Sequence, residues 1–308
     1  MLTHMLIRNA AKVHKLTIPV VPELGSQYVI ADISGLGPPK ATINQQPYAF
    51  QDGASYVSSK TEIRNIVVTI RYRQLSAGKS VQTLRRELYS IFPTNKKVNL
   101  RFESDDFVPV STEAWVESHE PVIFSAEPSV QIVLLGLQPW LEGMNAISIP
   151  LEHISGFGGT SSQYMPIKNV GDVETGMLYG VFMDNTTPDI PETTNILFDN
   201  LYPDGGRSVV VLNSARLRAI TGQKLRAGDT LYVESRPGHR GVSLVRSGLW
   251  YNVIGAIQNA SDAVETQWSS LVPGIEGSNL INYSITGSTA AWQHSSAAAT
   301  YTPLYEGI

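Results

Sequence analysis

Cysteine is absent from this sequence of 308 residues. Disulfide bonds and metal sites with cysteine ligands are therefore excluded, and a chain without disulfides suits folding in a reducing cytoplasm. No apolar run approaches the ~18 residues that a membrane-spanning helix needs, so we expect no membrane partner. The first eight residues also lack the basic start and the long apolar middle of a signal peptide.

Helical periodicity is nearly as scarce. One stretch has the apolar spacing of an amphipathic helix, and Ser80 before it and Pro93 after it are typical start and stop residues. The apolar residues at this spacing are Val81, Leu84, Leu88 and Ile91. The sequence therefore predicts one helix, over about residues 79–92.

Short strands separated by turns are predicted for most of the rest. Apolar and polar residues alternate over residues 66–73 and 98–102, on either side of the helix. Other strands in the first half are expected at residues 6–8, 16–18, 28–30, 114–118 and 130–135. In the second half they are expected at residues 147–149, 164–167, 193–198, 208–212, 217–220, 230–234, 242–245 and 280–285.

These patterns predict a mainly β protein with two domains. Residues 1–143 read as a β-barrel-like or split β-sheet with one α-helix, and residues 144–285 as a β-sandwich. Residues 286–308 begin with many Ser, Ala, Thr and Gly residues and read as a weakly ordered C-terminal extension. Gly and Pro punctuate residues 33–60, which predicts an extended loop that is functional or ordered by a partner.

Charge is unevenly distributed. The net charge is −4, but residues 60–101 hold ten basic and two acidic residues, a local charge of +8. The basic side chains could meet acids elsewhere in the fold, bind phosphate, or contact an acidic neighbouring subunit. No nucleic-acid motif and no interleaving of aromatic and basic residues accompanies them, so we expect no specific nucleic-acid partner.

No constellation predicts catalysis, a metal or a cofactor. Gly78-Lys79-Ser80 resembles the end of a phosphate loop, but Arg73 stands where that motif needs its first glycine. The six histidines share no metal-ligand spacing, and residues 184–189 read as a solvated turn. A hydrolase that uses Glu103 and Asp106 stays as an alternative, because paired carboxylates can hydrolyse glycosides.

A carbohydrate-binding module for host attachment is another alternative. Tryptophans on a sandwich can form a stacking platform for sugars, although they more often fill a core. The aromatic residues considered for a host glycan are Trp140, Trp250, Tyr251, Trp268 and Trp292.

Short motifs in a fixed order make the chain resemble the distal tail proteins of siphophages. In the first half these are Gly35-Leu36-Gly37-Pro38-Pro39, Asp52-Gly53, Arg64-Asn65-Ile66 and Gln138-Pro139-Trp140. In the second half they are Gly171-Asp172, Ala227-Gly228-Asp229-Thr230-Leu231-Tyr232-Val233, Arg236-Pro237-Gly238, Trp268, Val272-Pro273-Gly274, Asn279 and Tyr283. Residues 181–192 read as an inserted loop in this pattern.

The resemblance implies a structural virion protein that is not an enzyme. Six copies would form a ring at the distal end of the tail, assembled in the bacterial host cytoplasm. The ring would join the tail tube protein to the tip hub, tail-associated protein or fibres, and the second domain would be a galectin-like β-sandwich. Because a sheet with one helix leaves strand edges unpaired, neighbouring copies would complete it. The predicted subunit contacts are Gly35, Gly37, Pro38, Pro39, Ile66, Val68, Arg71 and Arg73.

Overall fold

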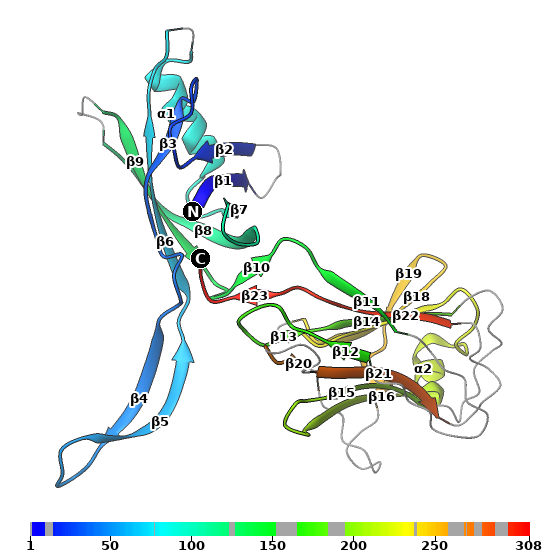
Figure 1. Cartoon of the computed structure of the whole chain (residues 1–308). Helices are drawn as coiled ribbons and strands as arrows, with labels where there is room; N and C mark the ends of the chain where they lie inside the picture. The colour runs from blue at the N-terminus through cyan, green and yellow to red at the C-terminus, as the bar shows by residue number, and fades with distance from the viewer. Residues whose placement is uncertain are drawn as a thin grey trace. The chain divides into compact units, whose positions relative to one another are not determined.

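The computed structural model describes residues 2–9, 15–76, 78–122, 127–151, 165–183, 195–236, 239–257, 268, 270–273, 279–286 and 295–308. The chain forms two compact units: Met1–Met144 with Leu304–Ile308, and Asn145–Pro303. Its path leaves the first unit, builds the second and returns to the first (Figure 1). None of the described helices is long and apolar enough to span a membrane.

One antiparallel sheet forms the first unit. Its strands follow the order β2-β1-β7-β8-β9-β6-β3, with β10 beside β8 and β23 beside β10. They are β1 (Leu2–Asn9), β2 (Lys15–Pro19), β3 (Tyr28–Ser34), β6 (Arg64–Tyr72), β7 (Lys97–Ser104), β8 (Val110–Val122), β9 (Ser129–Gly136), β10 (Leu141–Gly143) and β23 (Leu304–Tyr305). The end strands β2 and β3 lie near each other, but no described ladder joins them, so the barrel-like sheet is open.

A single apolar stripe attaches helix α1 (Val81–Ile91) to this sheet. Leu84, Leu88 and Ile91 are buried in the same core as the inward-facing residues of the strands. The Thr83 backbone N–H donates a hydrogen bond of 3.3 Å to the Ser80 side chain, so Ser80 is the N-cap. The predicted helix is confirmed, with slightly shorter bounds.

Residues 33–60 contain a β-hairpin and not the predicted extended loop. Strands β4 (Ala41–Pro47) and β5 (Ala54–Thr61) pair with each other and with no other described strand. The hairpin runs away from the sheet, beyond the ends of β3 and β6 (Figure 1). No face of it is buried, so nothing imposes the apolar alternation that reveals a strand. We call residues 41–61 the arm.

The second unit is a sandwich of two antiparallel sheets, as predicted. One sheet has the order β11-β22-β14-β17-β18-β19 and the other β12-β21-β15-β16, with a separate pair of β13 and β20. The strands are β11 (Ile147–Leu151), β12 (Met165–Ile167), β13 (Thr175–Gly176), β14 (Leu178–Met183), β15 (Asn195–Leu201), β16 (Arg207–Asn213), β17 (Thr230–Glu234), β18 (Gly241–Arg246), β19 (Leu249–Asn252), β20 (Ser270–Leu271), β21 (Asn279–Thr286) and β22 (Ser295–Tyr301).

One apolar core joins the two sheets of the sandwich. Tyr179 of β14 and Phe198 of β15 are both buried, and their ring centroids lie 5.2 Å apart across the interface. At one end of the sandwich the Asp229 carboxylate holds the buried Arg246 guanidinium, with Nε at 2.8 Å. A fully paired ion pair of this kind satisfies charges that would otherwise be costly to bury.

Two expectations for the second half need correction. Residues 217–220, predicted as a strand, lie in helix α2 (Ser214–Thr221), whose N-cap Asn213 accepts a hydrogen bond of 3.1 Å from the Arg216 N–H. Only Ser214 and Leu217 of this helix are buried, so it lacks a clear apolar stripe. A short 3₁₀ turn, η1 (Ile254–Ala256), lies close to it.

The predicted extension 286–308 also differs from the structure. Residues Ser295–Tyr301 form β22, which pairs with β11 on one side and β14 on the other. Its small residues have a weak strand propensity of their own, and the two neighbours supply the ladder. Val181–Met183 of the predicted inserted loop end β14, whereas residues 184–192, the predicted turn at 184–189 and Trp292 lie outside the described residues.

Candidate subunit-contact surface

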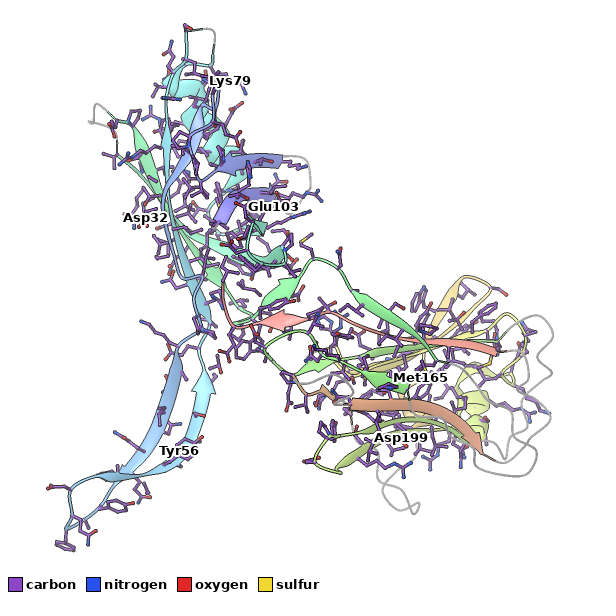
Figure 2. The ribbon with its side chains drawn as sticks, in the orientation of Figure 1. Asp32, Tyr56, Lys79, Glu103, Met165 and Asp199 are labelled. Atoms are coloured by element: carbon purple, nitrogen blue, oxygen red, sulfur yellow. The ribbon has the colours of Figure 1, made fainter. Side chains whose placement is uncertain are left out.

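The arm is a hairpin without a core that exposes five large apolar side chains. Every residue of β4 and most of β5 are exposed. Its exposed large apolar side chains are Ile43, Tyr48, Phe50, Tyr56 and Val57, and Phe50 at the tip is 99% exposed. Tyr56, labelled in Figure 2, lies on the arm. Several exposed aromatic and branched residues on one small element are typical of a surface that a partner covers.

Local hydrogen bonds fix the shape of the arm. The Tyr56 hydroxyl donates to Ser59 Oγ at 2.9 Å, and Asn44 Nδ2 donates to Ser58 Oγ at 2.9 Å. The Tyr48 N–H closes the tip on the Gly53 carbonyl at 3.2 Å, where Gly53 has a φ of +107°. A two-stranded hairpin alone is only marginally stable in water, so the arm depends on what anchors it and what it binds.

A buried arginine anchors the root of the arm. Arg64 is 3% exposed, and its guanidinium donates to four backbone carbonyls: those of Gly35, Gly37, Pro139 and Glu306. These bonds measure 2.7, 2.7, 2.8 and 2.5 Å. Burial lowers the pKa of Arg64, although arginine remains charged in proteins. Four carbonyl dipoles therefore replace the water that the cation loses.

Two glycines at this root, Gly35 and Gly307, have no room for a side chain. Gly35 has a φ of +85°, and a Cβ there would lie 1.9 Å from the Asn65 carbonyl oxygen. A Cβ on Gly307 would lie 2.7 Å from the carbonyl carbon of Gly37. Leu36 between the glycines is buried, and its carbonyl accepts from the Ile308 N–H at 3.0 Å. Loop 35–38 is therefore pressed between β6 and residues 306–308.

The predicted contact residues divide into different groups. Gly35 and Gly37 form the arm root, with Pro38 and Pro39 between them and the arm. Ile66 and Val68 are fully buried in the core of their own unit, so their side chains offer nothing to a neighbour. The period-2 pattern places Ile66 and Val68 on the apolar face of the strand, which is the face that a core buries.

The two arginines of this set lie on the exposed face. Arg71 of β6 and Arg73 just beyond it have exposed side chains. Arg71 forms an ion pair of 3.5 Å with Glu127, and both side chains are more than half exposed. An exposed pair of this kind contributes ~0–1 kcal/mol. Arg71 can therefore exchange its partner for an acid on another subunit at little cost.

Acids of the same unit account for part of the +8 charge. Within the described residues, three basic side chains of the span pair with acids outside it: Arg71–Glu127, Lys97–Glu113 and Arg101–Glu103. A fourth pair, Lys79–Glu87, lies inside the span, so its acid is already counted in the +8. Lys79 thus contacts a helix glutamate, and Ser80 caps the helix, so Gly78-Lys79-Ser80 serves as a turn and cap. Gln27 also holds this turn, because its side-chain amide donates to the Lys79 carbonyl at 3.0 Å.

The alternative carboxylate site receives no support from this geometry. Glu103 Oε1 accepts from Arg101 at 2.9 Å, and the Asp106 N–H is bound by the Ser104 hydroxyl at 3.1 Å in a local turn. Among the described residues, no group of three or more His, Asp or Glu side chains could hold a metal ion.

Known proteins resemble this chain in sequence over residues 24–154 and in fold over both units. Residues 24–154 match the family model described as phage tail protein RIFT-related domain. The Dit protein of phage SPP1, described as a paradigm of the hub adsorption apparatus in phages that infect Gram-positive bacteria, matches with a TM-score of 0.64 and 12% identity. That match covers 97% of this chain and 98% of the Dit chain. No curated protein sequence matches.

A second solved structure agrees. A chain of the phage P2 baseplate, in its activated conformation with calcium, matches with a TM-score of 0.52 and 12% identity over 100% of both chains. Residues 24–154 include the arm, Arg64 with the loop at residues 35–38, and helix α1, so the matched sequence contains most of the candidate surface. The resemblance to siphophage distal tail proteins is therefore confirmed: residues 24–154 match the phage tail protein RIFT-related domain, and the whole chain has the fold of SPP1 Dit.

Proposed function

We propose that this protein is a structural, non-enzymatic component of the distal end of a siphophage tail. Six copies close into a ring that joins the tail tube protein to the tip hub, tail-associated protein or fibres. The ring assembles in the cytoplasm of the bacterial host and remains at the tail tip of the virion. The proteins that match this chain, a phage tail domain, a hub protein and a chain of a baseplate, support this role.

The observation that carries the proposal is the arm. Its apolar residues have no partner surface within the described part of the chain, and both of its edges present unpaired backbone groups. A ribbon of this kind gains stability when it lies against another subunit. We expect the arm of each copy to lie on a different surface of the next copy; repeated around a closed rotation, such a heterologous contact gives a ring.

The first experiment measures the mass of the purified protein by native mass spectrometry and its appearance by negative-stain imaging. We expect a ring with six times the chain mass of 33.6 kDa. The double variant Tyr48→Ser/Phe50→Ser should shift the protein to the monomer, since both side chains are exposed and their loss leaves the core intact. Leu24→Ser, an equally exposed apolar residue outside the arm, is the matched control and should still form rings.

Two results would count against different parts of the proposal. A folded wild-type protein that stays monomeric at high concentration would rule out the ring. A ring that survives the double variant would rule out the arm as its contact. Charge reversal at Arg71 and Arg73 tests the exposed arginines separately, and unchanged ring formation would exclude them as contacts.

A further inference from the structure

The outer face of the six-stranded sheet carries a row of apolar and aromatic residues. The ladders place Phe182, Thr230, Val245 and Trp250 side by side on four adjacent strands. The next row on the same face consists of Pro150, Ala298, Gly180, Tyr232, Ser243 and Asn252. The opposite face of this sheet is the core, so these side chains face away from it.

Small residues leave a hollow between the aromatic ones. A depression of about 410 Å³ lies over β22, β14 and β17, with Phe182 and Tyr232 along it and Gly180 and Ala298 beneath. Its complete lining is Leu178, Gly180, Phe182, Thr230, Tyr232, Ala297, Ala298 and Thr300. A Cβ on Gly180 would lie 3.3 Å from the Tyr232 ring, so glycine keeps this hollow open. We call it the sandwich groove.

A stacked aromatic pair extends one side of the sandwich groove. The Tyr232 and Trp250 rings lie nearly parallel, at 16°, with centroids 5.6 Å apart. Trp250 is nevertheless 69% exposed, because it lies on the edge strand β19. Phe182 on the other side is also exposed. Flat aromatic surface that stays in water while lying beside a hollow is typical of a binding site.

The polar groups of the sandwich groove are neutral. Thr230 and Thr300 contribute hydroxyls to the lining, and Thr300 Oγ1 donates to Ser148 Oγ of β11 at 3.1 Å. None of the eight lining residues is charged, so the groove offers no counter-charge to a phosphate, an acidic peptide or a cation. Its chemistry is aromatic faces with hydroxyls, which can both donate and accept hydrogen bonds.

We infer that the sandwich groove binds a neutral saccharide. The C–H face of a pyranose ring packs on an aromatic ring, and its equatorial hydroxyls meet the threonine and serine hydroxyls around it. The groove therefore fits a segment of an uncharged glycan, whether free or part of a cell-surface polysaccharide. This site belongs to the second unit and does not depend on the arm or on ring formation.

The test titrates the full-length protein with cellohexaose, maltohexaose and an N-acetylglucosamine hexamer, and measures binding by calorimetry and tryptophan fluorescence. Polygalacturonate is the charged comparison. We expect binding of at least one neutral oligosaccharide, and about tenfold weaker binding by Trp250→Ala, the loss expected for one aromatic contact. Ala298→Leu should fill the hollow and also abolish binding, whereas Leu249→Ala, an exposed apolar residue outside both rows, should leave the affinity unchanged.

Three results would overturn the inference. The first is a folded protein that binds none of the neutral sugars, and the second is binding that Trp250→Ala and Ala298→Leu do not weaken. The third is a preference for polygalacturonate. The molecular mass of each variant is measured in the same samples. A change in assembly on Trp250→Ala without any sugar binding would show that this face contacts protein.

Discussion

At the scale of single residues, Arg64 decides how the arm is held. Its four carbonyl partners come from three segments far apart in the sequence, at residues 35–37, 139 and 306. The motif Arg64-Asn65-Ile66 supported the family resemblance, but the sequence could not reveal these partners. Backbone carbonyls exist at every position and leave no trace in residue identity. The sequence therefore indicates that the segment around Arg64 matters, but not which groups the Arg64 side chain binds.

The first prediction concerns this arginine. Arg64→Ala removes a buried side chain whose guanidinium links four backbone carbonyls, and should destabilise the first unit by about 1–3 kcal/mol. Arg64→Lys should cost about 1–3 kcal/mol, because a lysine cannot reach four separated acceptors with the geometry of a guanidinium. Urea unfolding, with hydrogen exchange of residues 33–40 as the probe, measures the loss of stability in both variants. Arg71→Lys at an exposed site is the control, and an equal effect there would contradict the assignment.

The second prediction concerns His119 of β8. Its ring packs on Tyr89 of α1, with ring centroids 4.6 Å apart. Burial lowers the pKa of His119, and a backbone hydrogen bond raises it by a smaller amount. The unfolded state therefore binds the proton more tightly, and stability is lost as the pH falls below the unfolded value of 6.5. We expect His119→Asn to reduce the loss of unfolding free energy between pH 7.5 and 5.5. The wild type and the variant share the other five histidines. The same dependence of unfolding free energy on pH in both would therefore refute this role of His119.

At the scale of elements, the sequence predicts what a core enforces. Strand β6 and helix α1 each have a buried face, so their apolar residues repeat at the period of the element. The arm has no buried face and β22 consists mostly of small residues, so pairing with neighbours, not pattern, makes them strands. For the same reason the candidate surface was predicted in place, at residues 33–60, but its hairpin was not.

The third prediction tests the one helix that the pattern revealed. Leu88→Ala removes a fully buried side chain of α1 and should destabilise the first unit by about 2–5 kcal/mol. Arg86→Ala on the exposed face of the same helix should change stability by less than about 0.5 kcal/mol. The urea midpoint of the transition assigned to the first unit measures both. Equal midpoints would mean that α1 does not share the core of the sheet.

At the scale of the whole molecule, the last segment of the first unit follows the second unit in the sequence. Leu304 and Tyr305 form β23 on β10, and Glu306 to Ile308 complete the root of the arm through Arg64 and Leu36. These residues are synthesised after the entire sandwich. The contacts of Glu306 and Ile308 with the arm root therefore form only after the second unit has been synthesised.

The fourth prediction follows from this order. A chain ending at Pro303 loses β23, one of the four Arg64 acceptors and the bond between Ile308 and Leu36. We expect faster hydrogen exchange at residues 33–40 and 62–66, and weaker ring formation. Hydrogen exchange in the strands of the second unit should not change, because the core of that unit does not include residues 304–308. The double variant Glu306→Ala/Ile308→Ala keeps the backbone contacts and is the matched control. Because those contacts are made by main-chain atoms, it should assemble like the wild type, whereas an effect as large as that of the truncation would assign the role to the side chains.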